Sequence, residues 1–187
     1  MLEVCNITKI YKQFQKKSIA CKDISFTAKE GEIVSLLGLN GAGKSTIIKI
    51  ITGVVRPTIG DVIVEGHSIN NSPIEAKREM GVLYENAPLY NELTVEEFLM
   101  FSIQMRAIGK KDASYLAMEA LEMGDLLDVK NKKIATLSKG YRQRVAFASI
   151  LAHRPRVLIL DEPTANLDSL QLRAFEKRIL QLDKTKI

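Results

Sequence analysis

A glycine-rich segment of this chain has the residue types and spacing of a phosphate-binding loop. It reads Gly38-Leu-Asn-Gly-Ala-Gly-Lys44-Ser45, which matches the pattern Gly, four residues, Gly, Lys and then Ser or Thr. Glycines let the backbone turn tightly so that N–H groups face phosphate oxygens, and a following helix adds its positive dipole end. We expect Lys44 to neutralise the β- and γ-phosphates and Ser45 to hold Mg²⁺. The pattern predicts binding of a nucleoside triphosphate, without separating kinases, GTPases, motors and transporters.

Two adjacent carboxylates follow an apolar segment further along the chain. Residues 157–160, Val-Leu-Ile-Leu, form the continuous apolar run typical of a strand buried on both faces, and Asp161 and Glu162 come directly after it. Because open α/β sheets bind ligands at the carboxyl ends of their strands, one carboxylate can hold Mg²⁺ through water while its neighbour activates the attacking water. A solvated acidic turn explains the pair equally well when it is taken alone. Together with the glycine-rich loop, the pair favours hydrolysis.

The elements that position these motifs follow from the apolar patterning. Short β-branched runs bounded by turns predict strands at residues 2–10, 19–27, 32–37, 61–65 and 156–160. Apolar residues at helical spacing predict helices at residues 46–52, 94–106, 112–123, 138–153 and 169–182. Thr94 with Glu97 matches a capping box, and Asp112 and Ser138 are the expected N-caps of the next two helices. This order predicts an α/β core, residues 1–85 and 153–187, interrupted by a helical subdomain at residues 86–152.

Between the two motifs lies Leu137-Ser-Lys-Gly-Tyr-Arg-Gln-Arg144, and with it the chain resembles the nucleotide-binding subunits of ABC transporters over nearly its whole length. Residues 137–141 resemble the family's signature, residues 157–162 its Walker B motif and residues 163–168 its D-loop. The resemblance implies a single ABC ATPase domain. Its fold would be a P-loop NTPase core with a mixed or parallel sheet, an N-terminal antiparallel β part and the inserted helical subdomain.

The resemblance also assigns roles to individual residues. It implies that Glu162 is the catalytic base, that Ser45, Glu85 and Asp161 bind Mg²⁺, and that Asp168 belongs to the D-loop. Packing at a strand end would also explain Tyr11, the expected partner of adenine, and a helix cap would explain Asp168. The signature residues Ser138, Lys139 and Gly140 would contact the ATP held by a second subunit. The residues expected to bind ATP within the same subunit are Tyr11, Gly38, Leu39, Asn40, Gly41, Ala42, Gly43, Lys44, Ser45 and Thr46.

The chain departs from the family pattern in three ways. Glu85 stands where Gln is usual, and its carboxylate can accept hydrogen bonds but has no amide to donate them. Lys139 and Tyr141 replace a Gly and a Gln of the signature, a variant that resembles the ABC-2 exporter-like branch. The sequence has no His after Asp168, where the family has a switch His. We therefore expect the C-terminal part of the domain to be missing, with hydrolysis more affected than binding.

The composition is that of an ordinary globular protein. Apolar residues make up 46% and charged residues 26% of the 187 residues, and Cys5 and Cys21 have no spacing that predicts a disulfide framework or a metal site. The longest apolar runs, residues 33–39 and 157–160, fall far short of the roughly 20 residues that cross a bilayer. We expect a cytoplasmic protein, and the resemblance implies that it is peripheral on the inner face of the cell membrane.

The sequence also bears on the partners of the chain and on alternative functions. The resemblance implies a second ABC ATPase subunit, identical or different, and an integral membrane permease, whereas no direct contact with nucleic acid is expected. The net charge of +5 suits a nucleotide, an anionic lipid surface or nucleic acid alike. One alternative is therefore a soluble ABC ATPase that acts on nucleic acid or the ribosome, although the chain has none of the long insertions of such proteins. Another is an ATP-gated interaction module that does not hydrolyse ATP, and a P-loop kinase is a more distant third.

Overall fold

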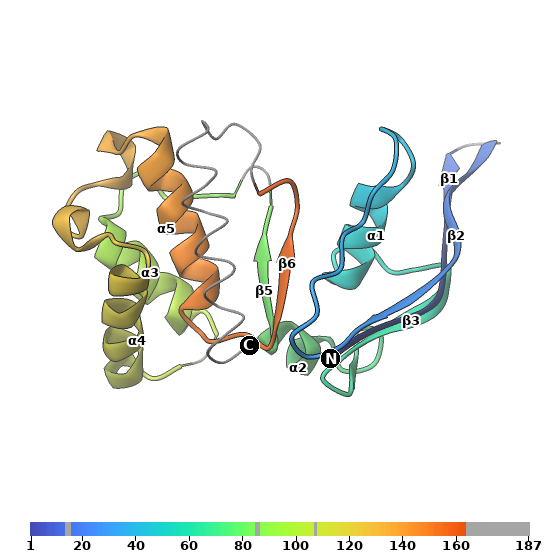
Figure 1. Cartoon of the computed structure of the whole chain (residues 1–187), viewed down its shortest axis with the longest axis horizontal. Coiled ribbons are helices and arrows are strands. Elements are labelled where there is room, and N and C mark those ends of the chain that lie inside the picture. The colour runs from blue at the N-terminus through green and yellow to red at the C-terminus, as the bar shows by residue number, and fades with distance from the viewer. Residues whose placement is uncertain (14–15, 85–86, 107, 164–187) are drawn as a thin grey trace. The chain divides into compact units, whose positions relative to one another are not determined.

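The computed structural model describes residues 1–163, apart from residues 14–15, 85–86 and 107, and apart from the side chains of Gln13 and Lys16. The chain divides into two compact units. The first comprises Met1–Met80 and Arg156–Asp161, and the described part of the second comprises Gly81–Pro155 and residues 162–163. Each unit has its own buried apolar residues, and Figure 1 labels the helices and strands.

The first unit contains a four-stranded antiparallel sheet in the order β2-β1-β3-β4. Its strands are β1 (Leu2–Gln13), β2 (Lys16–Ala28), β3 (Ile59–Val64) and β4 (His67–Ser68). In the central strand β1, Leu2 stands opposite both Ala28 and Val64, and the alternate residues Leu2 and Val4 are buried, as a half-covered sheet requires. The predicted strands at residues 2–10, 19–27 and 61–65 are confirmed, and so is the N-terminal antiparallel part.

Two helices belong to the same unit. Helix α1 (Lys44–Ile51) lies against β2 (Figure 1) and buries Ile47, Ile50 and Ile51, which share one face because they are three and four residues apart. It begins two residues earlier than predicted. The sequence analysis missed α2 (Pro73–Arg78), a six-residue helix that has Ser72 at its N-cap and Pro73 as its first residue. A helix this short has no room for a clear apolar period.

The apolar run at residues 32–37 is a correction, because it was predicted to be a strand and has no strand structure. Its side chains Ile33, Val34, Leu36 and Leu37 are exposed. A strand needs a hydrogen-bonded neighbour as well as β-branched residues, and within the described residues this run has no such ladder. The apolar pattern predicted burial that no neighbouring element provides here.

The strand at the Walker B-like segment is confirmed, but its burial is not. β5 (Met80–Leu83) and β6 (Val157–Leu160) pair in a two-stranded parallel sheet. β5 was also missed, since four residues are too few for a periodic signal. In β6 only Ile159 is buried, whereas full burial was expected for all four residues. The reason is that β6 has β5 as its only strand neighbour within the described part of the chain.

The second unit is built on three packed helices, α3 (Val95–Gln104), α4 (Lys110–Met123) and α5 (Lys139–Leu151), each in contact with the other two. The 3-10 turns η1 (Leu127–Val129) and η2 (Ile134–Thr136) connect α4 to α5. Leu99, Ile103, Leu121 and Val145 are fully buried or nearly so in the core between the helices. The inserted helical subdomain is thereby confirmed as a structural feature. Among the described residues, no helix has the length and apolarity that crossing a membrane requires.

The helix caps show which local predictions hold. Thr94 and Glu97 form the predicted capping box, in which each side chain binds the other residue's backbone N–H. The N–H and hydroxyl groups of Thr94 both donate to Glu97 and lower the pKa of its carboxyl, so this contact stabilises the folded state at neutral pH and is lost as the pH falls through that lowered value. Ser138 caps α5 as predicted. The predicted cap at Asp112 is wrong, because α4 begins after Gly109 and includes Asp112 in its first turn.

Candidate functional site

The glycine-rich loop ends where α1 begins. Gly41 and Gly43 have left-handed backbone angles, φ 81° and 93°, which glycine adopts without strain, and Gly43 is the N-cap of α1. No side chain caps this helix, and its first turn contains no acidic residue. The first N–H groups of a helix have no acceptor within the helix and carry its positive dipole end. This helix start is therefore open to an anion such as a phosphate.

The loop is held closely against the antiparallel sheet. A Cβ atom built on Gly43 would lie 2.1 Å from the backbone oxygen of Ala20 in β2 and 3.8 Å from the Cβ of Cys21. Because the nearest atom is backbone, the sheet cannot yield by rotating a side chain. Glycine at this position is needed both for its φ and for this close approach.

We expect Gly43→Ala to weaken Mg-ATP binding at least tenfold, because the loop must move away from Ala20 and its amides then no longer converge. The matched control is Gly66→Ala, at φ 80° with no atom within 4 Å of the added Cβ. Both variants carry the backbone strain of about 1–2 kcal/mol that a left-handed alanine costs. Titration with a fluorescent ATP analogue, together with urea unfolding, separates the two effects. Parental affinity in Gly43→Ala would contradict the close-approach argument.

Lys44, the first residue of α1, folds back over the loop. Its ammonium Nζ donates to the backbone oxygens of Gly38 at 2.7 Å and Leu39 at 3.0 Å. The charge therefore lies over the loop, where phosphate oxygens would compete with the two carbonyl groups for it. Ser45 follows with an exposed hydroxyl. A hydroxyl oxygen is a suitable ligand for Mg²⁺ beside phosphate oxygens, so the residues present fit a magnesium nucleotide.

Tyr11 lies near this loop through strand pairing. It stands opposite Ser18 of β2, two residues from Ala20, the residue against which Gly43 packs. The ring is 41% exposed, and the Lys9 ammonium lies 5.2 Å from its centroid. A tyrosine that only packed in the core would be covered by other side chains. The exposed ring is thus suited to stacking on a planar base.

The two carboxylates follow β6 as the sequence places them. Asp161 is half-buried and Glu162 is exposed, with Glu162 at φ 49°, in the left-handed region that is uncommon for a residue with a side chain. The side-chain Nε2 of Gln143 in α5 donates to the backbone oxygen of Pro163 at 3.1 Å. Gln143 therefore supports the segment that carries Glu162. No local sequence signal predicted this role for Gln143, because its partner is 20 residues away in the chain.

The signature-like residues form the start of α5 in the second unit. Ser138 is the N-cap and its Oγ accepts the N–H of Tyr141 at 3.5 Å, while Lys139 and Gly140 open the helix. Ser138 and Lys139 are exposed, and the first turn of α5 has no acidic residue. This is a second helix start suited to an anion. Two further predicted site residues, Glu85 and Asp168, lie outside the described residues.

The glycine-rich loop, the uncapped helix behind it and the folded-back lysine together define a P-loop nucleotide-binding domain. Residues 21–165 match the ABC transporter family, and the chain belongs to that family. The expected P-loop NTPase fold is thus confirmed. Domains of this family bind and hydrolyse ATP, which agrees with the prediction of an ATPase.

Solved structures agree with this assignment. One is the ATP-binding cassette MJ0796, a dimeric structure of a post-hydrolysis state bound to ADP and Pi. It is 30% identical to this chain with a TM-score of 0.85, and the match covers 98% of this chain and 83% of the MJ0796 chain. An ATP-binding subunit of an ABC transporter is 30% identical with a TM-score of 0.84, at coverages of 98% and 75%. The protein cbiO1 from Clostridium perfringens, part of the ABC transporter complex cbiONQ, is 26% identical with a TM-score of 0.83, at coverages of 98% and 73%.

Proposed function

We propose that this chain is the ATP-hydrolysing subunit of an ABC transporter and energises transport through a separate membrane permease. The observation that carries the proposal is the phosphate-binding start of α1, where Gly43 approaches Ala20 closely and Lys44 lies over the loop. We further propose that the direction is export, because Lys139 and Tyr141 make the signature resemble that of the ABC-2 exporter-like branch. With such a partner, the chain would lie on the cytoplasmic face of the membrane.

In the proposed mechanism, the amides of residues 38–46 and the Lys44 ammonium bind the phosphates while Tyr11 stacks on adenine. Ser45 and Asp161, with Glu85, would hold Mg²⁺, which supplies charge neutralisation at the β- and γ-phosphates when it is bound. Glu162 accepts a proton from water as the water oxygen bonds to the γ-phosphorus. The bond between that phosphorus and the bridging oxygen breaks in line, giving ADP and inorganic phosphate.

A second subunit completes the proposed site. The exposed Ser138 and Lys139, with Gly140, present helix N–H groups that suit a γ-phosphate. We propose that two subunits, identical or different, pair head to tail, so that each ATP lies between the loop of one subunit and the signature residues of the other. The dimeric structure of MJ0796 bound to ADP and Pi supports the pairing of two subunits.

A groove in the second unit supports the permease as partner. It has a volume of about 290 Å³ and is lined mainly by apolar side chains, among them Leu89, Tyr90, Phe98, Phe101 and Met105. Tyr90 packs edge-on against Phe101, with ring centroids 5.3 Å apart. An aromatic-lined groove on an exposed surface suits the apolar face of a short helix. We propose that a cytoplasmic helix of the permease binds here and receives the movement that accompanies hydrolysis.

Substitution in the groove tests the proposed function. We expect Phe101→Asp to reduce recovery of the chain with cell membranes at least tenfold while ATP hydrolysis by the purified chain stays within twofold of the parent, since a carboxylate would be buried against an apolar helix. Met118→Asp is the matched control, because Met118 and Phe101 are both 38% exposed but Met118 lies on α4 outside the groove. Unchanged membrane recovery of Phe101→Asp, or salt-sensitive binding to nucleic acid at physiological ionic strength, would contradict the permease assignment.

A further inference from the structure

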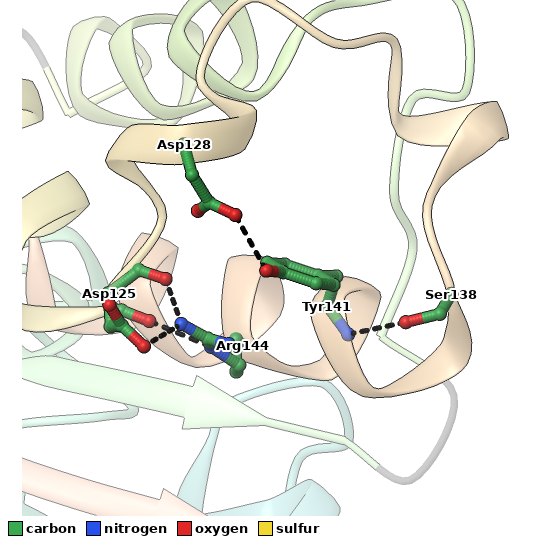
Figure 2. Close-up of polar contacts among 6 residues, drawn as sticks. Asp125, Asp128, Ser138, Tyr141 and Arg144 are labelled. Atoms are coloured by element: carbon green, nitrogen blue, oxygen red, sulfur yellow. Dashed lines mark hydrogen bonds and ion pairs between the residues drawn. The ribbon is translucent and has the colours of Figure 1, made fainter.

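The first two turns of α5 are tied to a neighbouring segment, residues 124–128, by two side chains that the proposed mechanism does not use. Figure 2 shows the Tyr141 hydroxyl directed at Asp128 and the Arg144 guanidinium directed at Asp125. Tyr141 and Arg144 are three residues apart, so they lie on the same face of α5. This face of α5 is the one that contacts residues 124–128.

The contacts are short and charge-assisted. The Tyr141 hydroxyl donates to Asp128 Oδ2 at 2.7 Å. The Arg144 guanidinium donates from Nε to the backbone oxygen of Gly124 at 2.9 Å and from Nη2 to Asp125 Oδ2 at 2.6 Å, and Nη2 also donates to the backbone oxygen of Asp125. The guanidinium carbon lies 4.7 Å from the centroid of the Tyr141 ring. The aromatic ring is therefore held at its hydroxyl end by Asp128 and by the cation of Arg144.

The segment that receives these bonds is itself fixed in the core of the second unit. Leu126 is completely buried and Val129 is buried beside it, and the N–H of Leu126 donates to the backbone oxygen of Leu121 at 2.9 Å. Asp128 lies between these two anchors, within η1. The carboxylate that accepts the Tyr141 hydroxyl is thus attached to a rigid part of the fold.

We propose that Tyr141 is a positioning residue, which fixes the orientation of the signature end of α5 through Asp128 and so sets the geometry in which Ser138 and Gly140 meet the partner's nucleotide. This inference rests on the proposed function. The hydroxyl group points away from Ser138 (Figure 2), so Tyr141 acts through the helix and not on the ligand. The hydrogen bond to Asp128 raises the pKa of the Tyr141 phenol, which keeps the donor proton in place at physiological pH.

The test removes the hydroxyl and keeps the ring. In the purified full chain, Tyr141→Phe is expected to lower kcat for ATP hydrolysis and to weaken ATP-dependent dimerisation, each roughly threefold to tenfold, the size expected for one hydrogen bond. The affinity of the monomer for a fluorescent ATP analogue, measured at low protein concentration, should stay within twofold of the parent. A residue that only stabilised the fold would not separate kcat from nucleotide affinity in this way.

Partner and control variants complete the experiment. Asp128→Ala should match Tyr141→Phe, the double variant should lose no more than either single variant, and Asp128→Asn, which keeps an acceptor oxygen, should restore most of the activity. Tyr115→Phe removes an exposed hydroxyl on α4, elsewhere in the unit, and should change nothing. Parental kcat and dimerisation in Tyr141→Phe, or independent losses in the double variant, would overturn the positioning role. A parent chain that shows neither hydrolysis nor ATP-dependent pairing would instead overturn the proposed function, and this inference with it.

Discussion

Replacing Lys44 with alanine is expected to weaken Mg-ATP binding about a hundredfold and to reduce hydrolysis below detection. The ammonium lies over the phosphate-binding loop, within hydrogen-bonding distance of the oxygens of Gly38 and Leu39. It is half-buried there, so its attraction to a phosphate is screened less than that of a surface lysine. One charged donor in such a site is worth about 3 kcal/mol, which corresponds to a factor of about a hundred.

The control for this experiment lies on the same helix. Lys49 is exposed and lies in the last turn of α1, at the other end of the helix from the loop. Lys49→Ala changes the net charge by the same amount and is expected to leave the affinity for ATP within twofold of the parent. Affinity is measured by titration with a fluorescent ATP analogue in the presence of Mg²⁺, and thermal unfolding without nucleotide shows whether either variant loses stability. If Lys44→Ala binds ATP as tightly as Lys49→Ala, the assignment of the loop is wrong.

Replacing Glu162 with glutamine should have the second large effect, a fall of about 10²–10⁴ in kcat with ATP affinity preserved. Glutamine keeps the shape of the side chain but cannot accept the proton of the attacking water. Since hydrolysis would no longer cause the two ATP-bound subunits to dissociate, the dimer should accumulate in the presence of ATP. Single-turnover hydrolysis and size-exclusion chromatography with and without Mg-ATP measure the two consequences.

Glu75→Gln is the matched control for this substitution. Glu75 is exposed on α2, and the change removes the same charge and introduces the same amide. It should hydrolyse ATP at the parental rate and form no lasting dimer. Hydrolysis by Glu162→Gln at the rate of the control would show that another group accepts the proton. Loss of ATP binding in Glu162→Gln would show that the carboxylate has a structural role in the loop after β6.

The sequence alone determined the features that depend on neighbouring residues. The glycines at positions 41 and 43 allowed the tight left-handed turn of the loop, the Thr94–Glu97 capping box started α3, and Ser138 capped α5, each through atoms a few residues apart. The same locality made the phosphate-binding loop predictable, because glycines followed by the start of a helix define an anion site without distant partners. The order of the motifs also predicted the family, which the match of residues 21–165 confirms.

Only the tertiary structure decided the features whose partners are distant in the chain. The apolar residues 32–37 have the composition of a strand, yet they form none because strand structure depends on a paired neighbour. Tyr141 was noticed only as a departure from the family pattern, since its partner Asp128 is 13 residues away and reaches it through the fold. In the same way, nothing in the sequence placed Ala20 against Gly43. Local hydrogen bonding is encoded within one turn of chain, whereas these contacts exist only after the core has brought separate segments together.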